Sequence, residues 1–449
     1  MNGNTMKFSF YFLAILFCIA SPAFQAAQAQ SIGTTSYPEV TFSGTVRYRS
    51  ELDGRFFDFN ARPLHYDLLR TQIGATVKFS KDILLVTKLQ DARNFGEEDA
   101  TQARGTLDGT AKNFGLREGY VLWNNFLTEG LSVKFGRMIF GTNNMRIIGS
   151  LEWNNIGRSY DGNIIAYKAA EKTQIRAFAF KLGNDELYMT QAKAQQSQTL
   201  FGADIDLPWQ DKLNLYCYYD RNATPLLRGP DAGAAQLTRG TTGFYIKNAT
   251  GDFEYEIEAS HQLGSCKTTD STARADINAN VAAAFVSYKA QKDLSVGIGC
   301  DFYTGNDKNT PEENESFEHL FITGHQFYGF MDFFPSASMP TTGQRKSPEF
   351  TGAGLIMPYL KSTYIYDEKL SFQIWAMMFN AQLPIAGTTS KNIGAEIDIN
   401  AYYKFQKNVK FEAGFGTFLP GEATKTTNPS VGMGTDPSYW GYVMFTLDW

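Results

Sequence analysis

The chain has few of the residues that build disulfide frameworks and metal sites. It contains only 4 cysteines and 4 histidines in 449 residues. Beyond the first thirty residues the cysteines are Cys217, Cys266 and Cys300, an odd and widely spaced set without the short spacings of a zinc site. The histidines also lack the spacing of a helical metal motif. We therefore expect no metal ion and no other cofactor.

The chain also lacks an excess of basic residues and the sequence motifs of nucleotide-binding loops. The formal net charge is −5, whereas nucleic-acid binders normally carry a basic excess, so we expect no nucleic-acid partner. No GxxxxGK[ST] loop occurs, and Gly-x-Gly pairs such as Gly297/Gly299 lack the third glycine of a dinucleotide loop. The segment 157–161 begins like a nucleophile elbow but lacks its second glycine. These absences argue against an enzyme.

Long apolar runs are absent after the first thirty residues. Near the start, Lys7 precedes an apolar run from Phe8 to Ala20, and small residues follow up to Ala29. This pattern is typical of a secretory signal peptide, so we predict a signal peptide over 1–29 and one mature domain over 30–449. Since no later stretch reaches about eighteen apolar residues, no transmembrane helix is expected in the mature chain.

The dominant pattern that is present is alternation of apolar and polar residues with a period of two. It is clear in segments 40–51, 253–262 and 392–405, and it indicates strands with one apolar and one polar face. Read throughout, the chain contains about eighteen such segments of roughly ten residues, the length that a tilted strand needs to cross a bilayer. A secreted all-β protein with many hairpins is the alternative.

The connections favour a membrane barrel. Short polar turns, such as Ser80-Lys81 and Thr250-Gly251, alternate with long segments such as 304–346. Outer-membrane barrels have this asymmetry, with tight periplasmic turns and long external loops. We therefore predict an all-β protein, a transmembrane antiparallel β-barrel of about eighteen strands, in contact with the lipid of the bacterial outer membrane.

The last segment carries a further signal. Tyr439, Val443, Phe445, Leu447 and Trp449 share one face, and the chain ends on the aromatic Trp449. Such an ending resembles the C-terminal signal by which the barrel assembly machinery recognises its substrates, so this machinery is an expected partner.

In a barrel, the polar faces of the strands line the lumen. Early segments would contribute basic residues and later segments acidic ones, so a field across the lumen is expected to select solutes by charge. Alternatively, these side chains pair with lateral neighbours and only keep the lumen wet. The predicted lining residues are Arg47, Arg49, Arg70, Lys88, Arg176, Glu254, Glu256, Glu258, Glu396 and Asp398.

The stretch 135–162 adds Arg137, Arg146, Arg158 and Asp161. By parity Arg137 would face lipid, where an arginine costs about 2 to 4 kcal/mol at the midplane. We therefore predict a bulge at Gly136, or a strand end there, that turns Arg137 inward.

Two stretches resemble the signature segments of the alginate export family of outer-membrane proteins. They are GRMIFGTNNMRIIGSLEWNNIGRSYDG (136–162) and SFEHLFITGHQFYGFMDFF (316–334), and residues 69–96 are similar to the family's early strands. The resemblance implies a monomeric barrel of eighteen strands with an arginine-rich lumen. It would place Arg137, Arg146, Arg158 and Asp161 at a constriction, near Arg47, Arg49 and Arg70. The three successive glutamates of 254–258 depart from what a polyanion conduit needs.

Together these observations predict an outer-membrane channel for passive, charge-selected passage of an anionic polysaccharide or of small solutes. The segment 304–346 is expected to restrict its mouth. The alternatives are a surface-binding or adhesion barrel and an outer-membrane enzyme. The acidic run 307–315 could bind Ca²⁺, although it lacks EF-hand spacing and reads more simply as a solvated loop tip.

Overall fold

The computed structural model describes most of the chain beyond its N-terminal segment. The predicted signal peptide lies outside the described residues. No helix among the described residues is long and apolar enough to cross a membrane. The described ranges are 37–95, 114–183, 198–209, 211–222, 235–267, 274–307, 309–333, 352–385, 387–431 and 434–449.

The described residues form eighteen long antiparallel strands and a two-residue strand, β14 (Glu313–Asn314). The first nine are β1 (Glu39–Gly54), β2 (Leu64–Lys78), β3 (Ile83–Asn94), β4 (Phe114–Trp123), β5 (Leu131–Met138), β6 (Tyr160–Ala170), β7 (Thr173–Gly183), β8 (Gln198–Leu207) and β9 (Lys212–Asn222). The others are β10 (Ala235–Thr250), β11 (Phe253–Lys267), β12 (Arg274–Lys289), β13 (Leu294–Tyr303), β15 (Leu355–Ile365), β16 (Leu370–Asn380), β17 (Asn392–Gln406), β18 (Val409–Pro420) and β19 (Ser438–Asp448). The helical turns described are η2 (Gly324–Gln326), α3 (Glu422–Thr427) and η3 (Asn428–Val431).

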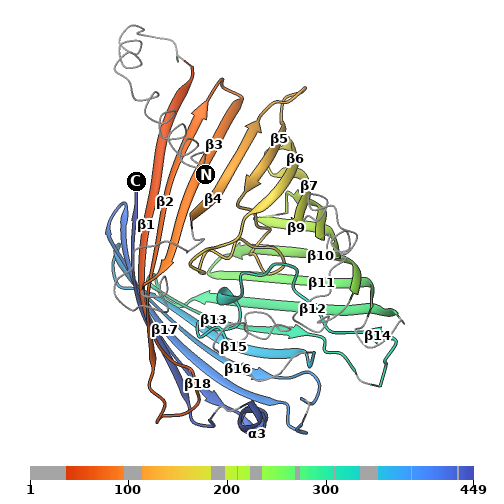
Figure 1. The fold of residues 1–449 in the computed structure, drawn as a ribbon, viewed down its shortest axis with the longest axis vertical. Helices are drawn as coiled ribbons and strands as arrows, with labels where there is room; N and C mark the ends of the chain where they lie inside the picture. Colours follow the sequence, from red (N-terminus) through yellow and green to blue (C-terminus); the bar gives the residue numbers. More distant parts are fainter. Residues whose placement is uncertain are drawn as a thin grey trace, which may run out of the picture.

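The strands close into a barrel. Each long strand pairs with its neighbours in sequence order, β13 pairs directly with β15, and β1 pairs with β19 over ten residue pairs. Figure 1 shows the first and last strands side by side. At this seam Gly44 and Trp449 exchange two backbone hydrogen bonds of 3.0 Å each. The predicted antiparallel barrel and its strand number are confirmed, although many strands are longer than the ten residues expected.

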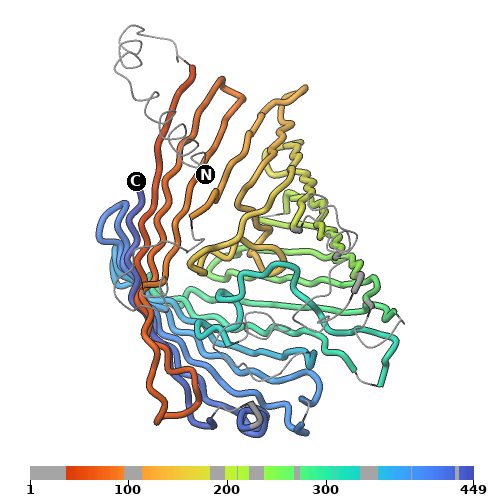
Figure 2. The backbone as a smooth tube through the Cα atoms, in the orientation of Figure 1, coloured from red at the N-terminus to blue at the C-terminus, as the bar shows by residue number. Residues whose placement is uncertain are grey.

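The connections alternate in length as predicted. Only two residues separate β10 from β11 and β17 from β18, whereas 139–159 lies between β5 and β6, and 304–354 between β13 and β15. Figure 2 follows this winding of the backbone from strand to strand. The short turns are periplasmic and the long connections external, which is the arrangement of outer-membrane barrels.

The outer face of the barrel is apolar. Phe42, Ile73, Ile298 and Val443 are each more than half exposed although they lie within paired strands. Such exposure is unfavourable in water and favourable in lipid, because the acyl chains replace the missing protein core. Exposed aromatic side chains gather near the short-turn ends, where an interfacial girdle is expected. They include Phe79, Trp209, Tyr366, Phe405 and Trp449.

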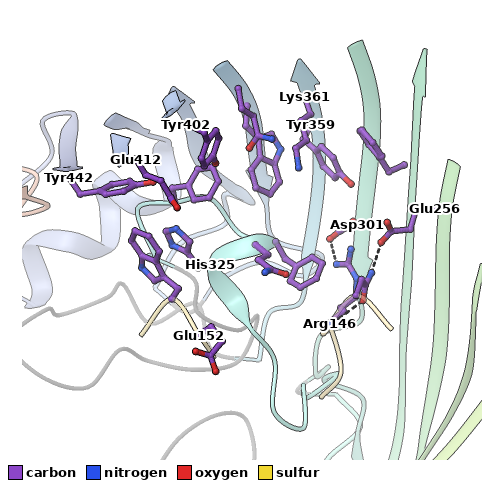
Figure 3. A pocket seen from close by; sticks show the side chains of 18 of the residues that line it. Arg146, Glu152, Glu256, Asp301, His325, Tyr359, Lys361, Tyr402, Glu412 and Tyr442 are labelled. Atoms are coloured by element: carbon purple, nitrogen blue, oxygen red, sulfur yellow. Dashed lines mark hydrogen bonds and ion pairs between the residues drawn. The ribbon is translucent and has the colours of Figure 1, made fainter. Parts of the chain in front are cut away.

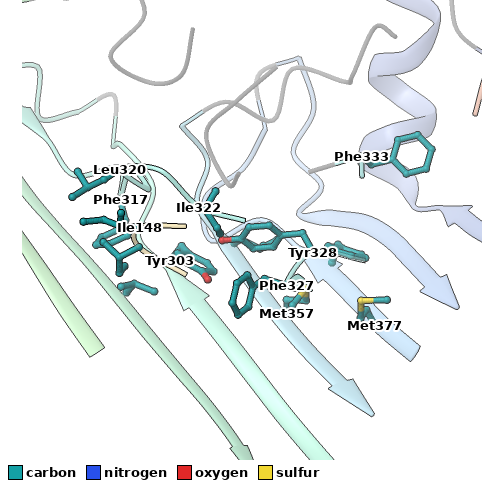
Figure 4. Close-up of a cluster of buried hydrophobic side chains, with 14 of the residues drawn as sticks. Ile148, Tyr303, Phe317, Leu320, Ile322, Phe327, Tyr328, Phe333, Met357 and Met377 are labelled. Atoms are coloured by element: carbon teal, nitrogen blue, oxygen red, sulfur yellow. The ribbon is translucent and has the colours of Figure 1, made fainter. Parts of the chain in front are cut away.

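The lumen contains an apolar core that the alternation did not predict. Phe178, Phe180 and Tyr218 point inward from β7 and β9 and are at most 4% exposed. They pack with Phe140 of the connection 139–159, and the same cluster continues into 315–333. Figure 4 shows part of this cluster, where Ile148 and Phe317 lie beside Tyr303. The barrel interior therefore holds two folded loops.

Candidate functional site

Two connections fold into the barrel and contact one another. We call them the first inserted loop (139–159) and the second inserted loop (315–333). Ile148 and Phe321 form a parallel bridge, the Phe321 amide donates to the Ile147 carbonyl at 2.8 Å, and the Gly149 amide donates to the Phe321 carbonyl at 2.7 Å. Because these bonds join the loops edge to edge, the pair narrows the lumen as a unit.

The predicted arginines of β1 and β2 hold the first inserted loop. Arg47 donates to the Glu152 carbonyl at 2.7 Å, and Arg49 donates to the Trp153 carbonyl at 2.7 Å. Arg70 also donates to the Glu152 carbonyl at 3.2 Å. Guanidinium groups are suited to this work because each presents several donors in one plane. The early basic wall is therefore largely engaged by backbone carbonyls.

Arg146 crosses from the first inserted loop to the opposite wall. Its guanidinium forms ion pairs with Asp301 of β13 and, at 3.3 Å, with Glu258 of β11, and it donates to the Tyr303 hydroxyl at 2.6 Å. Burial by itself lowers the pKa of Arg146, but Asp301, Tyr303 and Glu258 together raise that pKa well above its ordinary value. The predicted lining residues Arg146 and Glu258 are thus paired with each other, and Arg146 is shared with Asp301.

His319 of the second inserted loop connects this loop to the first inserted loop. Its Nδ1 lies 3.1 Å from the Arg146 carbonyl oxygen, and its Nε2 contacts the Tyr328 hydroxyl. Burial, and then the positive charge of Arg146, lower the pKa of His319 to about 3. The imidazole is therefore neutral at physiological pH, and His319 has a structural position between the two inserted loops.

Arg158 ties the base of the first inserted loop to the second. It donates to the carbonyls of Gly149 at 3.0 Å and Phe321 at 2.6 Å. Its guanidinium also lies over the Phe321 ring, 5.4 Å from the centroid. Arg158 is thus a tether between loops.

Glu396 and Asp398 hold the far end of the second inserted loop. Both carboxylates are fully buried on the inward face of β17. Glu396 accepts from the Met331 amide at 2.9 Å, and Asp398 accepts from the Phe330 amide at 3.0 Å. These carboxylates therefore serve as caps for backbone amides, the counterpart of the arginines that bind carbonyls.

Other predicted lining residues form lateral pairs, as the alternative interpretation proposed. Lys88 lies 2.8 Å from Glu118 of the next strand, and Arg176 lies 2.8 Å from Asp204. Glu254 lies apart from these groups, in a cavity of about 310 Å³ near the short turns.

The predicted bulge at Gly136 is wrong. The register of β5 runs without a shift against β4 as far as Arg137 and against β6 as far as the end of β5 at Met138. Arg137 therefore stays on the outward face, where it pairs with Asp161 of β6 at 2.6 Å, with 42% and 50% of the two side chains exposed. The desolvation argument fails because a carboxylate on the same face of the next strand satisfies the guanidinium at the external end of the strand. The structure thus separates Arg137 and Asp161 from the other predicted constriction residues.

A cavity of about 700 Å³ lies against the inserted loops on the side of the short turns. Figure 3 shows Arg146, Asp301 and Glu256 at one side of it and Tyr402, Glu412 and Tyr442 at the other. Lys247 and Lys361 also line the cavity. Among the described residues, no group of three or more His, Cys, Asp or Glu side chains is placed to hold a metal ion.

The sequence interpretation missed Lys247, Lys361 and the aromatic lining. Trp375 contacts Phe330 and Tyr359 at ring-centroid distances of 5.7 and 5.6 Å, and the Lys361 ammonium lies 5.0 Å from the Trp375 ring centroid. One signal was available for Lys247, because it lies directly opposite Glu256, a predicted inward residue. The aromatic rings had no such signal, since either face of a membrane strand can carry them.

A closed, lipid-facing barrel whose lumen is narrowed by inserted loops and lined by charged side chains defines an outer-membrane channel. The alginate export family matches residues 39–335 of the chain. Since this match spans more than half of the sequence, the chain belongs to the alginate export family, and its location is the bacterial outer membrane. Family and fold are those of channels rather than enzymes.

Solved structures of outer-membrane proteins share the fold. Acinetobacter baumannii OccAB3 has a TM-score of 0.59 at 9% identity, over 92% of this chain and 99% of that one. Pseudomonas aeruginosa OccK11 (OpdR) has a TM-score of 0.56 at 10% identity, over 91% of this chain and 95% of that one. A comparison with curated proteins gave no match.

Proposed function

We propose that the channel passes small anionic solutes that carry a ring, such as acidic sugars, by passive diffusion. The observation that carries this proposal is the cavity lining, where Lys247 and Lys361 lie with the rings of Tyr359 and Trp375. Ring faces bind the apolar faces of a planar or cyclic solute, and ammonium groups attract its acid group. A volume of about 700 Å³ is in the usual range of small-ligand pockets, about 300 to 1,000 Å³.

An anionic polysaccharide is the second candidate, and family membership favours it. Two observations weigh against a long polyanion. The inserted loops occupy much of the lumen, and Glu256 and Glu412 add negative charge to the same cavity. Every charged sugar unit of a long polymer would have to pass the inserted loops and these two glutamates. A small acid could instead orient its single charge toward the lysines.

The test is ion selectivity in planar bilayers. Under a KCl gradient, the double variant K247Q/K361Q is expected to shift the reversal potential toward cation selectivity, because two positive charges leave the cavity. Lys391→Gln is the matched control, since Lys391 lies exposed on a long loop and donates to the Gln382 carbonyl. An unchanged reversal potential in the double variant would remove these lysines from the permeation path.

Solute size is tested with the same membranes. D-glucuronate is expected to block the wild-type ion current, and the block should weaken in K247Q/K361Q. An alginate oligomer that blocks the ion current more strongly, per sugar unit, than the corresponding monosaccharide would favour the polysaccharide instead.

We also propose that residues 1–29 are removed as a signal peptide, that the barrel assembly machinery inserts the chain, and that the channel is a monomer. The N-terminal sequence of the purified protein and its mass in detergent test the first and last of these statements. A mature start far from Gln30, or a stable trimer, would contradict them.

A further inference from the structure

Glu152 is the one acidic side chain of the first inserted loop, and it sits on a cluster of buried arginines. Its carboxylate lies 3.2 Å from Arg70 and also contacts Arg117. The Glu152 side chain is 44% exposed, whereas those of Arg70 and Arg117 are 7% and 3% exposed. A half-exposed anion thus covers two buried cations.

The surrounding cluster has more positive than negative charge. Arg47 and Arg49 lie beside Arg70, and the direct acidic partner of Arg49 is Glu51 at 2.8 Å. Arg47 is bound to backbone carbonyls. The Nε atoms of Arg47, Arg70 and Arg117 are buried without a hydrogen-bond partner. The cluster therefore strongly favours a carboxylate at the position of Glu152, because buried cations are costly to leave unpaired.

The arginine cluster is reached from the cavity through Glu152. Both Glu152 and Arg47 line the cavity of about 700 Å³, and Figure 3 shows Glu152 at its edge, beyond His325. Arg70 and Arg117 do not line the cavity, so a solute carboxylate meets these two arginines where the Glu152 carboxylate now lies.

We propose that Glu152 is an internal competitor, which occupies the carboxylate position of the arginine cluster until an anionic solute replaces it. The inference rests on the proposed function, since it needs an anion in the cavity. Exchange of one carboxylate for another keeps the guanidinium groups paired throughout, so the solute gains access without exposing a bare buried charge. A partly exposed ion pair is weak enough to open. The exchange also releases the Glu152 side chain, one of the tethers of the first inserted loop.

The test is the concentration of D-glucuronate that blocks half of the ion current. Glu152→Gln removes the competing charge and keeps the side-chain shape, so the blocking concentration is expected to fall about tenfold, as for any site freed from an occupying state. Glu39→Gln is the matched control, because Glu39 pairs with Lys78 at 3.2 Å and lies outside the residues that line the cavity. Both variants lose one negative charge, but only Glu152→Gln should show the tenfold change. An equal or weaker block in Glu152→Gln would overturn the proposal.

A second measurement needs no variant. In the wild-type channel, saturating D-glucuronate is expected to speed hydrogen exchange of the backbone amides in 150–156, since displacement of Glu152 loosens this segment. Unchanged or slower exchange would count against competition. A wild-type channel with no anion preference and no glucuronate block would refute the proposed function itself, whereas a blocked wild type with an unaltered Glu152→Gln refutes only the competitor.

Discussion

At the residue scale, single side chains hold backbone inside the lumen. Arg47 and Arg49 bind carbonyls of the first inserted loop, and Glu396 and Asp398 bind amides of the second. Each contact satisfies a backbone group that would otherwise be buried unpaired. The charged walls are therefore as important for positioning the loops as for the field that a solute meets.

Gly329→Ala should open the constriction. Gly329 has φ +84°, and a Cβ there would overlap the Glu396 carboxylate, so the substitution strains the backbone by about 1 to 3 kcal/mol and displaces the Phe330–Met331 cap. We expect a larger single-channel conductance. Gly352→Ala is the control, because Gly352 has φ +81° with no atom near its Cβ position. An equal effect of both variants would assign the change to backbone strain alone.

Arg137→Ala should leave ion selectivity unchanged. Arg137 points away from the lumen and pairs with Asp161 on the outward face, so its loss weakens the external rim of β5 and β6 without altering the pore. The reversal potential under a KCl gradient measures this. A shift toward cation selectivity would place Arg137 back at the permeation path.

At the element scale, the two inserted loops form one folded unit within the barrel. The unit has its own apolar cluster and its own backbone bridge, and His319 joins its halves. Since His319 is buried as a neutral group, its environment makes loop stability depend on pH.

Acid should loosen the inserted loops. The pKa of His319 is about 3 in the folded channel and about 6.5 when the imidazole is exposed. The contribution of His319 to the free energy of loop docking is therefore fully present above about pH 6.5. It falls by about 1.4 kcal/mol for each pH unit as the pH is lowered toward 3. Hydrogen exchange of 316–333 at pH 7 and pH 4.5 should show faster exchange in acid after correction for the intrinsic rate. His319→Gln should lose much of this dependence, and an equal response would assign it to other groups.

At the scale of the whole molecule, barrel closure is independent of the inserted loops. β13 pairs directly with β15 from Leu294↔Tyr364 to Tyr303↔Leu355, and β1 pairs with β19. The hydrogen-bonded wall therefore continues behind the second inserted loop, and this loop fills a lumen that the strands have already enclosed.

Replacement of 316–333 by a short Gly-Ser linker should widen the pore and keep the barrel. The strand ladder remains complete, so heat-modifiable gel mobility should persist, while single-channel conductance should rise several-fold because the narrowest part is gone. A variant with unchanged conductance would show that another segment sets the pore width. Loss of heat-modifiability would show that the loop is required for the fold.

The barrel itself could be predicted from the sequence because its wall separates two environments, lipid on the outside and a polar lumen on the inside. Lipid accepts Phe42 and Ile298 on the outside, and the period-two alternation follows directly from that requirement. The inward direction of Arg47, Arg49, Arg70 and Glu258 was predictable for the same reason. Arg137 was not, since parity cannot tell that Asp161 neutralises it on the next strand.

By itself, the sequence determined the barrel class, the strand number, the short and long ends and the inward face of most strands. Only the tertiary structure decided what the inward charges do. Arg47 binds carbonyls about a hundred residues away, and Arg146 binds acids on β11 and β13. Inside the barrel, water, loop backbone and opposite walls all compete for the same charged groups. Which of these partners each charged group binds depends on distances across the lumen. A local pattern of residues contains no information about those distances.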